Sequence, residues 1–370
     1  MAYVAARGGE AAILEAERLY HDLNGALSPE RVEAVAQALP YLLDRVMGES
    51  SLYAPELAAL ALSQSGGELY EAALLLRAYR TTQPRVAYAQ TTEQADLLTV
   101  RRISAAFKDI PGGQVLGPTL DYSHRILQMD VIKAGVTLHE EAAPAAVAAS
   151  ATYPALAQWQ RQVGLLPSVP ASDLPAAEIP DLTREPLLFP ADRAHLLQGL
   201  ARADTGGILS LGYSIMRGYG LIHPTVNEVR LGYAEVRLTH PGTGVTFSAG
   251  RIRVSQAEIV TEFSGEAQRP ELALGFSATL GWNEVKVIAA GTLDMNMSKG
   301  EAHPAHTPEF VLYHTETVEA SGFCIHFKLP HYVTFQSALE AMRQVRQNPA
   351  QVNVPSQHPT PSASQEEVRT

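Results

Sequence analysis

Cysteine and charge are scarce in this chain. Its 370 residues include one cysteine, and charged residues make up 18% of the total. A single thiol excludes a disulfide within the chain, which points to a reducing compartment, and we expect a cytoplasmic protein. A hydrophobic fraction of 46% is typical of soluble globular proteins, and the length suits one large or two ordinary domains.

Long apolar runs are also absent. No stretch approaches the roughly 18 consecutive apolar residues that a membrane helix needs. The first apolar stretch contains Glu10 and Glu15, which does not match a signal peptide. The formal net charge of −11 argues against general binding to nucleic acid or to anionic membranes.

Common catalytic motifs are missing. The chain has no G-x-x-x-x-G-K-[ST] sequence, which disfavours a P-loop ATPase, and it has no H-E-x-x-H sequence or nucleophile elbow. The segment RGYGLIH at 217–223 lacks the third glycine of a dinucleotide-binding loop. None of these catalytic templates therefore applies.

The first 80 residues predict helices. From 67 to 80, apolar residues recur with the helical period. An earlier helical segment opens with Ser28 as its N-cap and Pro29 at its first helical position. Pro40 lacks the backbone N–H that a helix interior needs, so it should kink or divide this segment.

Strand patterns come later in the chain. Residues 109–124 are too rich in glycine and proline for a helix and predict an ordered loop with turns. Alternation of apolar and polar residues then predicts three strands, with a turn at Pro241-Gly242 between the first two. These strands are 232–240, 245–254 and 257–263.

Helices and strands occur in separate blocks, which predicts an α+β fold rather than a doubly wound sheet. We expect a mainly helical N-terminal region with a Pro-Gly-Gly loop, and then an Ala/Pro-rich linker or excursion with one short helix near Trp159. An α+β region with an antiparallel sheet follows. It contains residues 282–293, for which we favour a helix over a buried strand, and it ends in a helix with Thr334 as N-cap. A disordered tail completes the chain. The predicted boundaries are 1–140, 141–190, 191–347 and 348–370.

One segment is basic although the chain is acidic. Between Arg77 and Arg125, seven basic residues face four acidic ones. Such an excess of positive charge suits an anionic small molecule, and the alternative is a set of solvated helix faces. The basic residues are Arg77, Arg80, Arg85, Arg101, Arg102, Lys108 and Arg125.

Two histidines, His326 and His331, flank a Lys-Leu-Pro sequence. Regular structure would separate them, because a step of five turns the second side chain about 140° away on a helix and to the opposite face on a strand. A bend at Pro330 could instead turn both imidazoles toward one point, as a zinc site needs. The alternative is one buried, hydrogen-bonded histidine and one exposed at a helix start. Cys324 is either a third ligand or a small packing residue.

Four segments carry a family resemblance that runs from residue 3 to about residue 345. They are YVAARGGEAAI, LLLRAYRTT, RRISAAFKDIPGGQVLGPTLDYSHR, and RGYGLIHP together with EFVLYHTETVEASGFCIHFKLPHYVTFQ. The chain resembles the PhnI subunits of the bacterial carbon–phosphorus lyase complex. The third and fourth segments are long and unusual in composition, so the resemblance is specific.

The resemblance implies a glycosyl transfer within a complex. PhnI-like subunits work with PhnG, PhnH and PhnL to replace the purine of ATP or GTP with an alkylphosphonate, which gives ribose 1-methylphosphonate 5-triphosphate. Alone, they are associated with a nucleosidase reaction, in which water takes the place of the phosphonate. Radical cleavage belongs to PhnJ, which carries an iron–sulfur cluster, and a chain with one cysteine fits that division.

The resemblance also implies a metal site. It places His326 and His331 at a metal ligand pair on the PhnJ interface, with the shell of the expected Zn²⁺ completed outside this chain. It requires no cysteine at Cys324. The nucleotide is expected to bring Mg²⁺.

The chemistry itself suggests further residues. Displacing a purine from C1′ of ribose passes through an oxocarbenium-like state, and the triphosphate needs cations. For substrate binding we single out Arg101, Arg102 and Lys108 with the backbone of Gly112 and Gly113. The carboxylate of Asp109 or Asp121 could stabilise the oxocarbenium-like state. His124 or His223 could act as the acid toward the departing purine. Structural alternatives are a turn cap for Asp109, an Asp121–Arg125 pair and a simple bend at the two glycines.

Two rival functions stay open from the sequence. The chain could be a non-catalytic core subunit that forms a metal-bearing interface with PhnJ. A free-standing zinc hydrolase is disfavoured, because only two convincing ligands are present.

Overall fold

The computed structural model describes residues 9–123, 125–137, 151–169, 175, 178–218, 223–264, 271–298, 303–328 and 331–347. Within these residues the fold is α+β, as the sequence predicts. The chain divides into two units, Met1–Ala320 and Ser321–Thr370. The predicted boundaries at 140 and 190 stay predictions.

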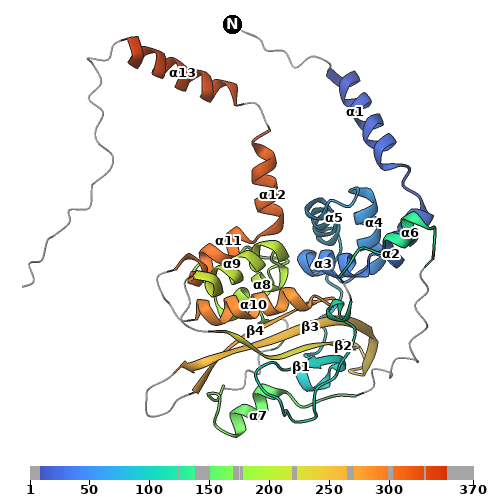
Figure 1. Cartoon of the computed structure of the whole chain (residues 1–370), viewed down its shortest axis with the longest axis vertical. Coiled ribbons are helices and arrows are strands. Elements are labelled where there is room, and N and C mark those ends of the chain that lie inside the picture. Colours follow the sequence, from blue (N-terminus) through green and yellow to red (C-terminus); the bar gives the residue numbers. More distant parts are fainter. Residues whose placement is uncertain are drawn as a thin grey trace, which may run out of the picture. The chain divides into compact units, whose positions relative to one another are not determined.

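A four-stranded antiparallel sheet lies in the first unit, in the order β1-β2-β3-β4 (Figure 1). The strands are β1 (Leu98–Ile103), β2 (Thr225–Thr239), β3 (Thr246–Ser264) and β4 (Glu271–Leu280). Helix α10 (Glu284–Met297) packs on one face of the sheet, where Val229, Ile259 and Met295 form a core. Helix α7 (Leu156–Gln162) lies toward the other face in Figure 1.

The predicted β2–β3 turn at Pro241-Gly242 is confirmed, but the strand prediction was wrong in one respect. Segments 245–254 and 257–263 belong to one strand, β3. The polar Ser255 lies in its middle without breaking it, because the Ser255 hydroxyl donates to the carbonyl of Gly281 (2.9 Å) and is satisfied while buried. Strands β1 and β4 are additions that the sequence analysis did not predict.

The N-terminal helices match the sequence pattern. The Ser28 hydroxyl accepts the backbone N–H of Arg31, and Pro40 separates α2 from α3, both as predicted. Leu43, Met47 and Leu62 pack in a core to which the helices between residues 29 and 81 contribute. The helices are α1 (Gly9–Asn24), α2 (Pro29–Ala38), α3 (Pro40–Ser50), α4 (Pro55–Gln64) and α5 (Leu69–Thr81).

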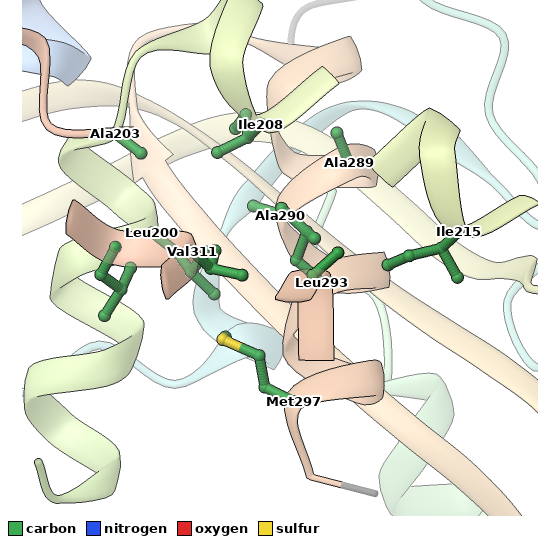
Figure 2. Close-up of a cluster of buried hydrophobic side chains, with 11 residues drawn as sticks. Leu200, Ala203, Ile208, Ile215, Ala289, Ala290, Leu293, Met297 and Val311 are labelled. Carbon is green, nitrogen blue, oxygen red and sulfur yellow. The ribbon is translucent and has the colours of Figure 1, made fainter. Parts of the chain in front are cut away.

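A second helical core covers the α10 face of the sheet. Leu200, Ile208, Leu293 and Val311 pack together between neighbouring helices, as Figure 2 shows. The predicted helix at 282–293 is therefore confirmed as α10, which contributes the central side chains of this cluster. The other elements are α8 (Arg193–Arg202), α9 (Thr205–Gly218), η4 (Pro304–His306) and α11 (Pro308–His314).

The predicted loop and excursion contain short elements. Residues 109–123 form a loop with the 3₁₀ turn η2 (Leu120–Tyr122), and η1 (Gln94–Asp96) precedes β1. Helix α6 (Met129–Lys133) follows the loop, and α7 is the short helix predicted near Trp159.

The second unit holds most of α12 (Thr317–His326) and all of α13 (Tyr332–Gln347). Thr334 lies inside the first turn of α13, so its prediction as N-cap was wrong. The backbone N–H of Phe335 donates to the carbonyl of His331 (3.1 Å), so the helix begins at Tyr332, two residues before Thr334. The predicted disordered tail, 348–370, lies outside the described residues.

Candidate functional site

The sheet face away from α10 carries a buried charged cluster. The Nε atom of Arg102 donates to the carboxylate of Glu228, and Arg230 Nη2 donates to the same carboxylate at 3.0 Å. All three side chains are fully buried. In the protein interior an unpaired charge would be expensive, so the three residues depend on one another.

The remaining donors of Arg102 also end on protein atoms. Its Nη1 donates to the carbonyls of Pro111 (2.7 Å) and Gly113 (2.9 Å), and its Nη2 donates to that of Pro154 (3.1 Å). The guanidinium has no surface from which to reach a phosphate. The structure therefore argues against the substrate contact predicted for Arg102 and gives it a role in closing the loop onto the sheet.

Gly112 and Gly113 form a tight bend. Both have positive φ angles, +84° and +75°, which favour glycine. The N–H of Gly113 donates to Ile110 (2.8 Å), and a Cβ on Gly112 would lie 3.0 Å from the ring of Tyr153. The loop turns its carbonyl oxygens toward Arg102, and the N–H of Gly113 is already bonded within the loop. This arrangement fits a structural bend better than a site in which backbone N–H groups bind phosphate.

Arg101 points to the other face of the sheet and anchors the same loop. Its Nε donates to Glu284 at the start of α10 (2.7 Å), and its Nη1 donates to the Tyr122 hydroxyl (3.1 Å). Asp121 lies 3.5 Å from Arg101 Nη2 and accepts from Arg125 at 2.9 Å. The structure thus brings Arg101 and Asp121 together, and it contains the Asp121–Arg125 pair that the sequence left as an alternative.

Lys108, Asp109 and His223 are exposed near one end of β2. The backbone N–H groups of Ala105 and Ala106 both donate to the carbonyl of Val226 (3.0 Å each), which joins the two segments. Among the described residues, these three are the sequence-predicted catalytic and substrate side chains that are exposed and form no ion pair. His124 lies outside the described residues.

Glu258, which the sequence analysis missed, joins the charged cluster. Burial, and next the neighbouring Glu228 carboxylate, raises the pKa of Glu258 to about 7, although a hydrogen bond from Asn227 (2.8 Å) opposes the change. Asn227 also exchanges two hydrogen bonds with Gln160 of α7 (2.7 and 2.9 Å). A buried carboxyl group that titrates near neutral pH is a recognised mark of proton chemistry, and structural networks produce it as well.

Lys286 is a second buried ionisable group that was missed. It lies in the first turn of α10, is 1% exposed, and has no hydrogen-bond partner for Nζ among the described residues. Burial lowers the pKa of Lys286 to about 8, although the nearby Glu49 carboxylate opposes the shift. A lysine directly before the apolar run VIAAG at 287–291 is the signal that could have marked it.

His326 and His331 come together in the second unit. Their Nε2 atoms lie 3.2 Å apart and their ring centroids 4.8 Å apart. Two nitrogens bound to one tetrahedral zinc at about 2.0–2.1 Å would be about 3.3 Å apart, so the spacing fits a shared ion. Helix α12 ends at His326, and α13 begins just after His331, which overcomes the separation that regular structure would impose.

Within the part of the chain that the structure describes, the surroundings of the histidine pair supply no further ligand. Among the described residues, no group of three or more His, Cys, Asp or Glu side chains is placed to hold a metal ion. Cys324 is exposed on α12, so it is not a buried packing residue as the alternative supposed. A tetrahedral site here would take its remaining ligands from elsewhere.

Comparison with known proteins identifies the family. Residues 2–349 match the model of the bacterial phosphonate metabolism protein family PhnI. The chain belongs to this family. The PhnI-family chain is 41% identical to HtxH of Stutzerimonas stutzeri, with 96% of the chain and 100% of that protein covered.

Two further relatives have a more specific name, alpha-D-ribose 1-methylphosphonate 5-triphosphate synthase subunit PhnI. The Rhizobium meliloti protein is 41% identical and covers 93% of the chain and 95% of its own length. The Escherichia coli protein is 37% identical and covers 93% and 98%. In the part of this PhnI-family chain that the structure describes, no helix has the length and apolar character of a membrane span.

Proposed function

We propose that this PhnI-family chain is a catalytic subunit of a complex that makes ribose 1-methylphosphonate 5-triphosphate from ATP or GTP and an alkylphosphonate. One observation carries the proposal: two relatives with that synthase name are 37–41% identical to the chain over nearly their whole length. The reaction is a displacement at C1′ of ribose, in which the phosphonate oxygen replaces the purine.

The proposed reaction makes three demands on the protein. The triphosphate needs guanidinium or ammonium groups, with Mg²⁺ to share its charge. The oxocarbenium-like state needs a negative group near C1′, and the departing purine needs a proton or a hydrogen bond. Of the side chains first assigned to these tasks, Lys108, Asp109 and His223 are exposed and form no ion pair among the described residues, and they stay proposals for substrate contact.

The first prediction is purine release by the isolated chain. With Mg²⁺ and GTP or ATP, the chain should form free purine and ribose 5-triphosphate, because water can enter where the phosphonate would attack. Chromatography of the products measures both, and adenosine, which lacks the triphosphate, is the control substrate. Formation of nucleoside diphosphate alone would identify a phosphohydrolase and contradict the proposal.

A second candidate function is a non-catalytic core subunit. The engagement of Arg101, Arg102 and Asp121 in contacts within the chain favours it, because these residues then build the fold rather than bind substrate. A chain that neither binds ATP nor releases purine would support this candidate.

Association with other subunits is the next part of the proposal. Phe323, Phe327 and Phe335 are 63%, 65% and 70% exposed, beside the histidine pair in sequence. Exposed aromatic side chains in such a group are typical of a protein interface. We take the partners to be PhnG-, PhnH-, PhnJ- and PhnL-type subunits.

The histidine pair is proposed to bind Zn²⁺ at such an interface. The 3.2 Å distance between the Nε2 atoms fits two imidazole ligands of one ion. When bound, zinc would supply a fixed positive charge that can polarise a substrate oxygen or hold two chains together. His326 and His331 hold the ion, and the partner, water or substrate completes its shell.

The second prediction concerns zinc content. In the assembled complex, His326→Ala and His331→Ala should each remove most of the zinc, because a single imidazole does not chelate. Elemental analysis per complex measures the loss. Cys324→Ala and His240→Ala are matched controls that should keep the metal. Full occupancy in the double-histidine variant would place the ion elsewhere.

A further inference from the structure

A large pocket in the first unit is lined by none of the residues assigned above to catalysis, substrate binding or metal binding. Its volume is about 870 Å³, within the range of small-molecule sites. One wall is the end of α5 with the segment that follows it, residues 80–88, and the opposite wall is residues 179–184. Arg80, Arg85 and Arg184 line it, together with Tyr88 and a single carboxylate, Asp181.

Positive charge is in excess around this pocket. Behind Arg80 lie the buried side chain of Arg77 and the partly buried side chain of Arg202, both ion-paired with Glu316. Three of these five arginines are ion-paired, with Glu316 or Asp181, and the Glu319 carboxylate also acts on Arg202. Among the described residues Arg80 and Arg184 have no ion pair, although Arg80 Nη1 donates to the carbonyls of Ser50 and Ser51.

The excess charge is costly without a ligand. Burial, and then the positive charge of Arg77, lowers the pKa of Arg80 and brings the pKa of Arg202 to about 10. In a chain with a net charge of −11, an anion bound in the pocket would stabilise such a concentration of cations.

The pocket is organised before any ligand enters. Arg85 pairs with Asp181 and donates to the Thr183 hydroxyl at 3.3 Å, and its guanidinium lies 5.2 Å from the centre of the Tyr88 ring. Although burial opposes ionisation of Asp181, hydrogen bonds from Thr183 and the charge of Arg85 hold its pKa below the ordinary value. The carboxylate therefore stays charged and fixes one arginine in place.

We infer that this pocket binds the purine nucleoside triphosphate of the proposed reaction, so the inference rests on the proposed function. A guanidinium group can donate two parallel hydrogen bonds to the oxygens of one phosphate, and Arg80, Arg85 and Arg184 supply three guanidinium groups. The half-exposed ring of Tyr88 offers a stacking surface for the purine. Apolar side chains such as Leu52 and Leu238 form the rest of the wall.

The rival location is the segment that carries Lys108. Leu238 borders the pocket, whereas Val226 lies beside the Lys108 segment, and the twelve residue steps along β2 from one to the other span about 40 Å. One nucleotide cannot reach both places. Variants at the two ends of β2 therefore give opposite results for the two hypotheses.

Calorimetric titration of the full chain with Mg²⁺-ATP, tripolyphosphate and adenosine tests the inference. Arg184→Ala should weaken the binding of ATP and tripolyphosphate at least 10-fold, because it removes a guanidinium group from the proposed phosphate site. Among the described residues the Arg184 side chain has no ion pair, so the fold should not depend on it. Tyr88→Ala should weaken ATP and adenosine but leave tripolyphosphate unchanged. Arg18→Ala, at an exposed arginine of α1, is the matched control, and thermal denaturation of each variant checks folding.

Several outcomes overturn the inference. They are a loss of ATP affinity in Lys108→Ala with none in Arg184→Ala, equal affinity of the wild type for ATP and tripolyphosphate, and no ATP binding by the wild type. Each concerns binding, so purine release decides the proposed function separately. A chain that binds ATP through Arg184 and Tyr88 without releasing purine would keep the pocket and lose the activity.

Discussion

Arg102→Ala should lower the free energy of unfolding by about 3 kcal/mol, the largest loss of stability that we predict for a single substitution in this chain. Removing one partner of a buried ion pair costs about 3–5 kcal/mol, because the other charge stays buried. Here the lower end applies, since Arg230 (3.0 Å) and Gln94 (2.9 Å) still hold Glu228. The carbonyls of Pro111, Gly113 and Pro154 also lose their donor.

Urea denaturation followed by circular dichroism measures this loss. Lys108→Ala, six residues away and exposed, is the control and should change stability by no more than about 0.5 kcal/mol. Arg102→Lys keeps the charge but not the fork of donors, so its stability should be intermediate. If Arg102→Ala kept full stability and lost nucleotide affinity instead, the substrate contact predicted from the sequence would be right.

The sequence assigned Arg101 and Arg102 the same task because both are basic and adjacent. On a strand, neighbours face opposite sides, and β1 sends Arg101 toward Glu284 and Arg102 toward Glu228. The alternation in Leu98–Ile103 could have indicated the strand. The two carboxylates could not be predicted, since each comes more than a hundred residues later and only the folded sheet brings it near.

Local signals predicted well where a single residue decides the structure. Ser28 caps α2, Pro40 divides two helices, and Pro241-Gly242 turns the β2–β3 hairpin, because each depends on its own backbone chemistry. The convergence of His326 and His331 was also predictable, since the proline between them forbids the regular structure that would keep them apart.

Tertiary contacts decided the rest. The burial of Lys286 depends on α3, which supplies Glu49 from a distant part of the chain. The pocket depends on two segments, 80–88 and 179–184, and the sequence predicts the second only as part of an Ala/Pro-rich linker or excursion. Its arginines were visible as part of a basic segment, but their meeting with Arg184 was not.

Glu258→Gln should stabilise the chain by about 3 kcal/mol at pH 8 and leave its stability unchanged at pH 4. The pKa of Glu258 is about 7 in the fold against an ordinary value of 4.5. Between these values the unfolded chain loses the proton while the folded chain keeps it, so stability falls as pH rises through this range. Above pH 7 the full penalty is present, about 1.4 kcal/mol for each unit of pKa difference.

Glutamine removes that penalty without removing the hydrogen bond, because its carbonyl oxygen can still accept from Asn227. The urea concentration at the midpoint of unfolding should therefore fall between pH 4 and pH 8, and it should fall further for the wild type than for Glu258→Gln. Glu235→Gln, at an exposed position of β2, is the matched control and should follow the wild type. Parallel curves for wild type and Glu258→Gln would mean that the carboxyl group is ionised in the fold at neutral pH, with Arg230 and Asn227 outweighing its burial.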